Sequence, residues 1–162
     1  MNTKDRDHAR FVKHLNESKY GVWLVADWLN DKHKFDVTIT SNTVSKGYAD
    51  RMDHVDRGDL YISKPSIEPM RVEVKSLSAE FTCKEEWPFG GEMIVCAKHS
   101  YDNAEPKPYM YVLLNNQKTH AIIIKGEDHD KWRVKVYPDK RYENMVQSFY
   151  ITSVEDVKFI EL

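Results

Sequence analysis

The alternation of charged and apolar residues in Met70–Ser76 constrains the fold of this chain more than any other sequence feature. Successive side chains of a β-strand point to opposite faces, so every second residue of this segment shares a face. Glu73 and Lys75 then lie on one face, and the valines beside them lie on the other, against a core. The run Gly58–Ile62 is a second short extended segment. We therefore predict two neighbouring strands.

The connection between these segments contains residues that form turns and interrupt strands, namely Pro65, Ser66 and Pro69. A hairpin at this connection would bring Asp59 close to Glu73. Carboxylate oxygens are preferred ligands of hard divalent cations such as Mg2+, and a nearby ammonium can orient a water molecule and stabilise developing negative charge. Asp59, Glu73 and Lys75 therefore suit metal-assisted cleavage of a phosphodiester bond.

An acidic residue followed two positions later by lysine is a weak motif in a chain of which 31% is charged. The same letters occur in Glu17-Ser18-Lys19 and in Asp156-Val157-Lys158, and Pro138-Asp139 precedes the second of these at a plausible distance. A cleaving centre on a central strand needs further elements to cover the sheet, and four residues follow Lys158. We therefore favour Glu73-Val74-Lys75.

The order of an N-terminal helix, a first strand, the Asp59 strand and the Glu73-Val74-Lys75 strand resembles the PD-(D/E)XK nuclease superfamily, and is similar to Holliday-junction resolvases and restriction-type endonucleases. The resemblance covers about half of the chain. It implies an α/β (α+β) fold with a restriction-endonuclease-like core, in which helices flank a central mixed β-sheet. It also implies that Asp59 and Glu73 ligate Mg2+ or Mn2+, that the Val74 carbonyl joins them and that Lys75 acts on the attacking water. Gly58 stands where relatives commonly carry proline.

Many members of this superfamily also have a glutamate in the first helix that reaches the metal. Here the expected position is Val22, and Glu17 lies about 140° around the helix from it at ~100° per residue. Two interpretations of Glu17 stay open: a group at or near the metal, and an exposed helix glutamate. Lys98 is a candidate accessory residue, because relatives sometimes place a polar group after the corresponding strand.

Composition fits one domain spanning residues 1–162, since 41% of the chain is hydrophobic. The net charge of -2 argues against a broadly basic nucleic-acid binder, so phosphate contacts would come from a local patch. The polar segment 41–57 precedes Asp59 and is either such a patch or a solvated loop. No signal peptide and no apolar run near twenty residues is present, which predicts a soluble, intracellular (cytoplasmic) protein with no membrane association.

Hydrophobic periodicity predicts a helix from Thr3 or Asp5 to Asn30, with a possible break at Gly21. Further strands are expected in one large mixed sheet, at residues 35–40, 93–97, 109–114, 121–125, 132–137 and 157–160. A hairpin turn is expected at residues 115–118. The aromatic residues of 78–92 favour anchoring in the core over base stacking.

Cys96 and His99 have the Cys-x-x-His spacing of zinc ligands, and Cys83 and His120 could complete a site with four ligands. We favour ordinary buried thiols, because these last two residues do not come as a spaced pair.

The sequence therefore predicts a metal-dependent deoxyribonuclease, most simply a structure-directed or repair-type endonuclease acting on DNA. One alternative is a non-catalytic nucleic-acid or protein binding module on the same fold. Another is that Glu73 and Lys75 form an ion pair on a solvated sheet face, worth ~0.2–1 kcal/mol. A homodimer would let one small domain cut both strands, and the sequence leaves this open.

Overall fold

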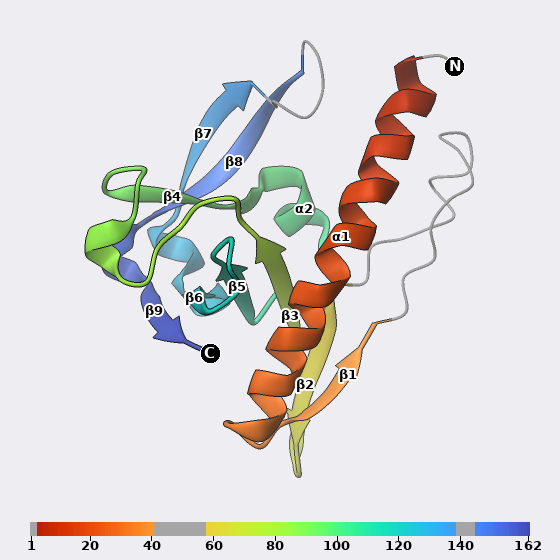
Figure 1. The fold of residues 1–162 in the computed structure, drawn as a ribbon, viewed down its shortest axis with the longest axis vertical. Coiled ribbons are helices and arrows are strands. Elements are labelled where there is room, and N and C mark those ends of the chain that lie inside the picture. Colours follow the sequence, from red (N-terminus) through yellow and green to blue (C-terminus); the bar gives the residue numbers. More distant parts are fainter. Residues whose placement is uncertain (1–2, 41–57, 139–144) are drawn as a thin grey trace.

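The computed structural model describes residues 3–40, 58–138 and 145–162, and for much of the first half of the N-terminal helix it describes the backbone alone. In these residues the chain forms a long helix, α1 (Thr3–Asp31), and two β-sheets, which makes the fold a mixed α/β arrangement (Figure 1). None of the described helices is long and apolar enough to cross a membrane.

The larger sheet, sheet A, has the strand order β1-β2-β3-β5-β6-β9. These strands are Asp36–Ile39 (β1), Leu60–Lys64 (β2), Ile67–Ser76 (β3), Met110–Leu114 (β5), His120–Lys125 (β6) and Lys158–Glu161 (β9). Neighbouring strands are antiparallel except β3 and β5, which run parallel. Sheet A is therefore mixed, as the sequence predicts.

The smaller sheet, sheet B, has the order β4-β8-β7. Its strands are Glu92–Ala97 (β4), Val146–Ser153 (β8) and Arg133–Pro138 (β7). Short helical turns complete the described chain: α2 (Lys98–Asn103), η2 (Lys84–Glu86), η3 (Gly126–Lys131) and η4 (Val154–Asp156). The prediction of one large sheet is wrong, because β4 and β7 pair with β8, a strand that the sequence analysis did not predict.

Helix α1 covers one face of sheet A through the apolar stripe expected from its sequence. Val22, Val25, Ala26 and Leu29 are buried against aliphatic residues of the sheet. The helix continues through Gly21 without a break. A Cβ at this position would lie 2.6 Å from Ser76 Oγ and 2.9 Å from Leu114 Cδ1, so the glycine allows the helix to approach the ends of β3 and β5 closely.

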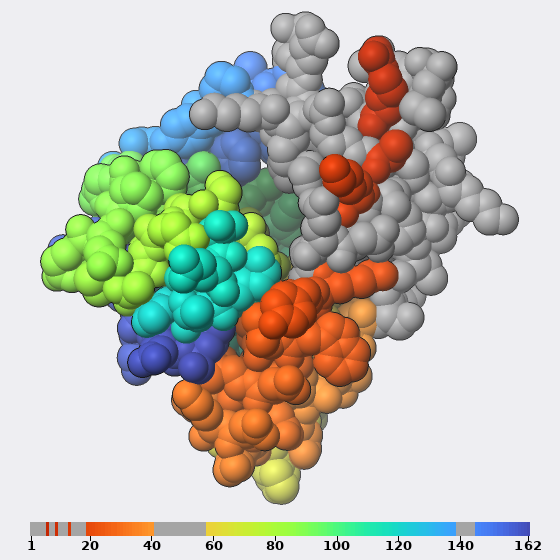
Figure 2. Space-filling view, viewed as in Figure 1, coloured from red at the N-terminus to blue at the C-terminus, as the bar shows by residue number. Residues whose placement is uncertain are grey.

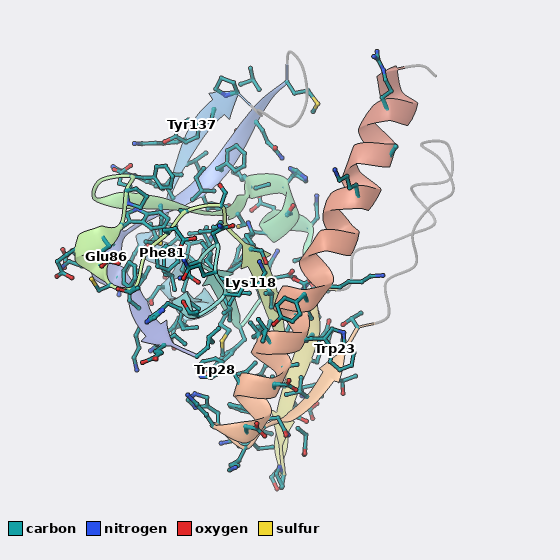
Figure 3. The ribbon with its side chains drawn as sticks, in the orientation of Figure 1. Trp23, Trp28, Phe81, Glu86, Lys118 and Tyr137 are labelled. Carbon is teal, nitrogen blue, oxygen red and sulfur yellow. The ribbon has the colours of Figure 1, made fainter. Side chains whose placement is uncertain are left out.

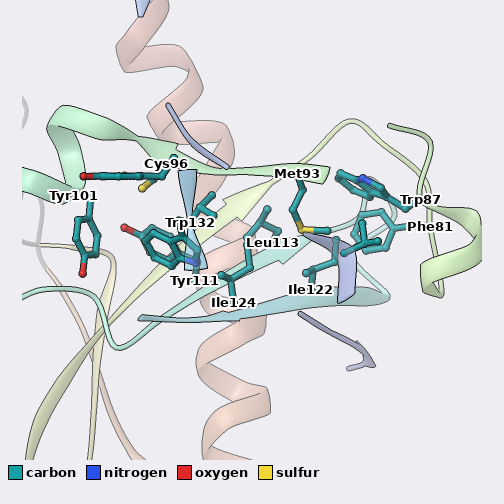
Figure 4. Close-up of a cluster of buried hydrophobic side chains, with 13 residues drawn as sticks. Phe81, Trp87, Met93, Cys96, Tyr101, Tyr111, Leu113, Ile122, Ile124 and Trp132 are labelled. Atoms are coloured by element: carbon teal, nitrogen blue, oxygen red, sulfur yellow. The ribbon is translucent and has the colours of Figure 1, made fainter. Parts of the chain in front are cut away.

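The opposite face of sheet A packs on sheet B through a second core, rich in aromatic side chains (Figure 4). It includes Phe81, Trp87, Tyr111, Trp132 and Tyr150. The expectation that aromatics of the 78–92 segment anchor in the core is confirmed for Phe81 and Trp87, whereas Phe89 is exposed. Within the described residues, then, helices do not flank both faces of sheet A: α1 covers one and sheet B covers much of the other.

The two predicted hairpins of sheet A are confirmed. β2 and β3 are joined by a tight turn at Pro65-Ser66, where Ser66 has a φ of 66°. Pro69 is not in this turn as expected but within β3, at a register shift where Glu68 and Pro69 oppose Ser63. A bulge tolerates proline because the backbone there makes no regular ladder bond.

The β5–β6 hairpin turns at Asn115–Lys118, and Lys118 N donates to Asn115 O (3.0 Å). The buried Asn115 side chain accepts from Thr119 N and His120 N. The space-filling view shows this turn, in teal, beside the second half of α1, in orange (Figure 2).

Candidate active site

The pairing of β2 with β3 places Asp59 and Glu73 beside one paired position, Leu60 with Val72. Asp59 directly precedes Leu60, and Glu73 directly follows Val72, so the two acids flank the last paired position of the hairpin. Thr40 N donates to Asp59 O (3.0 Å), so the backbone of Asp59 also continues the pairing with β1. The β2–β3 hairpin therefore brings Asp59 and Glu73 close together in the fold.

The Asp59 carboxylate is fixed by the backbone of β3: Val74 N donates to Asp59 Oδ2 at 2.7 Å. In a strand, the N–H and C=O of one residue point toward the same neighbour. The Val74 carbonyl therefore also points toward the Asp59 side of β3. Asp59 and the Val74 carbonyl, two of the predicted metal ligands, therefore lie near each other, just before the first residue of β2.

Glu73 is held by an arginine on its own strand. Arg71 Nε donates to Glu73 Oε1 at 2.5 Å, and the two side chains are 3% and 16% exposed. Gly58 makes room for this arginine: its φ is 88°, and a Cβ there would lie 2.6 Å from Arg71 Nε. No role for Arg71 is expected from the sequence, although the alternation of β3 puts it on the face of Glu73.

Lys75 lies on the same face and connects the two sheets. Its Nζ donates to Val95 O on β4 at 2.9 Å and lies 5.8 Å from the centre of the Tyr111 ring. Burial raises the pKa of the Tyr111 hydroxyl above its usual range, and burial likewise raises the pKa of the neighbouring Cys96 thiol. Both groups therefore stay neutral at physiological pH.

A cleft of about 1090 Å³ opens between β3 and sheet B, and Arg71, Glu73 and Lys75 are among its lining residues. Its other walls are largely apolar and aromatic, with Phe89, Phe149 and Tyr137 contributing. Tyr137 lies far out on β7 (Figure 3). Asp59 does not line this cleft itself and reaches the site through its bond to Val74.

Lys98, the predicted accessory residue, begins α2 and forms an ion pair with Asp102. The hydrogen bond to this carboxylate raises the pKa of Lys98. Its side chain also lies over the Tyr150 ring, 5.6 Å from the ring centre. His99 and Ser100 line the cleft, whereas Lys98 does not. The described contacts of Lys98 are thus with Asp102 and Tyr150, and its accessory role stays a prediction.

The first helix brings no described acid to the site. Val22, the position expected for a metal-reaching glutamate, is buried in the core between α1 and sheet A. Glu17 lies on α1, but its side chain is outside the described residues, as is the polar segment 41–57. Its role therefore stays a prediction.

The candidate zinc ligands Cys83, Cys96, His99 and His120 do not form a cluster. Among the described side chains, no group of three or more His, Cys, Asp or Glu residues could hold a metal ion. Cys96 is buried in the aromatic core, in line with an ordinary thiol, and Cys83 is half-buried beside η2. A metal bound by the described residues would depend on Asp59, Glu73 and a backbone carbonyl.

The rival acidic-x-Lys segments lie outside the central strands. Glu17-Ser18-Lys19 is on helix α1. Asp156 is in η4, 3.8 Å from Lys131, and Lys158 is exposed on β9, the edge strand of sheet A. The preference for the segment on β3 agrees with this placement.

Comparisons of the chain with family models, with curated proteins and with solved structures gave no match. The functional interpretation therefore rests on the residues and geometry of the site itself.

Proposed function

We propose that this protein is a metal-dependent deoxyribonuclease that hydrolyses phosphodiester bonds with Asp59, Glu73 and Lys75. The observation that carries the proposal is the β2–β3 hairpin, in which Asp59 and Glu73 flank the paired residues Leu60 and Val72 and Val74 N donates to Asp59 Oδ2 at 2.7 Å. Lys75 follows on the same face of β3, and both Glu73 and Lys75 line one cleft. Paired acids with a nearby ammonium are the group that metal-assisted phosphodiester cleavage requires.

The topology supports the finer proposal of a restriction-endonuclease-like core. A helix, a strand, the Asp59 strand and the Glu73-Val74-Lys75 strand follow in the expected order along the chain. The first three strands form an antiparallel unit, and the chain then crosses over through β4 and α2 to β5, parallel to β3. The Glu-x-Lys segment consequently occupies an interior strand of a mixed sheet, covered on both faces.

The donor atoms suit a hard cation, because Asp59, Glu73 and the Val74 carbonyl offer oxygen alone. An ionised carboxylate has about four lone-pair sites, so one carboxylate can accept a hydrogen bond and ligate a cation at the same time. Mg2+ or Mn2+ bound there would act as a Lewis acid on the phosphate and lower the pKa of a bound water.

The chain's own residues would position and stabilise the reacting groups. Val74 N–H fixes the orientation of Asp59, and Arg71 fixes that of Glu73. Lys75 Nζ donates to Val95 O, so its ammonium is anchored at the cleft, where it would orient a water or bind a phosphate oxygen. As the water oxygen bonds to phosphorus and the ester P–O bond breaks, this positive charge stabilises the transition state.

The proposal is tested by measuring Mg2+- and Mn2+-dependent cleavage of duplex, branched and single-stranded DNA. We expect Glu73→Gln and Asp59→Asn to lower the cleavage rate by about 10²–10³, the usual effect of removing one transition-state-stabilising group. Glu68→Gln is the matched control, since Glu68 is an exposed glutamate at the other end of β3. Full activity of Glu73→Gln would end the proposal.

A homodimer belongs to the same proposal, because two active sites would let one small domain cut both strands of a duplex together. Sedimentation of the protein with and without duplex DNA measures this directly. A monomer that nicks one strand would leave the active site proposal intact and remove the dimer.

A non-catalytic binding module is a second candidate, favoured by one observation. The Arg71–Glu73 ion pair already neutralises Glu73, and no third acidic ligand joins the pair among the described residues. Calorimetric titration with Mn2+ separates the two functions: a nuclease must bind the cation, whereas a binding module need not. Heat of binding in the wild type that is lost in Glu73→Gln favours the nuclease.

A further inference from the structure

The proposed function gives Arg71 a contact with Glu73 but no part in binding the substrate. It is the most buried charged side chain of the site, with 3% of its side chain exposed, and it lines the cleft beside Glu73. Arginine is not deprotonated in proteins, so its burial commits the site to a permanent positive charge. Such a charge requires an anionic partner at all times.

The backbone is adapted to hold this side chain. A Cβ on Gly58 would meet three atoms of Arg71, with Nε at 2.6 Å, Cγ at 3.0 Å and Cδ at 3.1 Å. Gly58 is itself buried and has a positive φ of 88°. The arginine therefore lies along Gly58, directly before Asp59, with its guanidinium at Glu73. This explains in physical terms why a proline would not fit at position 58.

The described side chains of the candidate site carry charges of both signs. Asp59 and Glu73 are negative, whereas Arg71 and Lys75 are positive, so these four residues sum to zero. A divalent cation bound to Glu73 would raise the formal charge of these four residues from zero to +2. The cation and the Arg71 guanidinium would then both contact the same Glu73 carboxylate. Like charges so close repel, most strongly where solvent is largely excluded. A phosphodiester entering the cleft would reduce this excess, and a guanidinium fork matches phosphate oxygens well.

We propose that Arg71 exchanges partners: it binds Glu73 in the cation-free protein and binds a phosphate oxygen of the nucleic acid once Glu73 holds the cation. This inference rests on the proposed function and adds to it a phosphate-binding residue and a coupling between two ligands. Because Arg71 opposes the cation until the phosphate arrives, each ligand strengthens the binding of the other. Thermodynamic linkage requires that the two effects be equal.

The test is a calorimetric titration with Mn2+, in the presence and absence of a non-cleavable phosphorothioate oligonucleotide. In the wild type, we expect the oligonucleotide to increase the affinity for Mn2+ at least tenfold. In Arg71→Met, Mn2+ alone should bind at least tenfold more tightly than to the wild type, since the competing charge is gone, and the oligonucleotide should change this affinity less than threefold. Arg133→Met is the control, because Arg133 is half exposed and pairs with Glu92 in sheet B.

Arg71→Lys provides a second variant if Arg71→Met does not fold. It retains the charge and loses the fork, so Mn2+ alone should bind as in the wild type while the coupling falls at least threefold. Coupling that survives unchanged in either variant, or a wild type without coupling that still cleaves DNA, overturns the role of Arg71 and leaves the proposed function in place. A wild type that neither binds Mn2+ nor cleaves DNA overturns both.

Discussion

The two faces of sheet A differ in chemistry although they share the same strands. The face toward α1 is aliphatic, with Val72 and Val74 of β3 packed against Val25 and Leu29 of the helix. The face toward sheet B combines an aromatic core with the charged residues of the cleft. β3 belongs to both faces, so one strand supplies residues to the helix-side core and to the candidate site. This separation predicts that stability and activity respond to different substitutions.

The largest expected effect is on stability, from the face toward α1. Leu29 is 1% exposed in the aliphatic core, and Leu29→Ala should lower the free energy of unfolding by about 2–5 kcal/mol, because a cavity remains. Urea denaturation measures this loss, and the cleavage rate per folded molecule should be unchanged. Ile67→Ala, a half-exposed position at the outer end of β3, is the control and should cost much less. An equal loss in both variants would contradict the proposed division between the faces.

A smaller effect, on the cleavage rate and not mainly on stability, is expected at Lys75. Lys75→Met retains the apolar length of the side chain and removes the ammonium, so we expect the cleavage rate to fall about 100-fold, equal to about 2.7 kcal/mol. The lost bond to Val95 O should cost only about 0.5–1.5 kcal/mol of stability. Lys125→Met, at an exposed lysine of β6, should leave the cleavage rate unchanged. If Lys75→Met cleaves as fast as the wild type, Lys75 has no role in the reaction.

The smallest effect concerns alkaline pH and the aromatic core. Burial raises the pKa of Tyr111 in the folded protein above the ordinary value of 10.0, so the unfolded chain releases this proton first. The contribution to stability is complete below about pH 10 and is lost as pH rises beyond it, at up to about 1.4 kcal/mol per pH unit. Urea denaturation between pH 8 and 11 should show a shallower decline for Tyr111→Phe than for the wild type. Tyr109→Phe, at an exposed tyrosine, should retain the wild-type slope.

Local sequence pattern was sufficient for most elements of sheet A. The apolar spacing predicts α1, and β-branched alternation predicts β1, β2, β3, β5, β6 and β9 within a few residues. The side-chain period also predicts that Glu73 and Lys75 share a face. These features depend on residues a few positions apart, whose relation is fixed by the geometry of a single helix, strand or hairpin.

Sheet membership was not predictable in the same way. The segments at 92–97 and 133–138 have the pattern of strands, but nothing in their periodicity indicates that they pair with β8 rather than with β3 or β5. Strand pairing between distant segments is decided by packing of whole faces, and the aromatic core between the sheets is a property of all its members together.

The sequence by itself determined the helix, the hairpins and the order of acids and lysine along β2 and β3, because each follows from local geometry. Only the tertiary structure decided that Gly58 makes room for Arg71, that Val74 N–H fixes Asp59, and that Lys75 reaches Val95 on the other sheet. These contacts join residues 13 to 20 positions apart along the chain. The distances between the residues in these contacts depend on how the strands of the two sheets pack. The side-chain period of a single segment does not specify that packing.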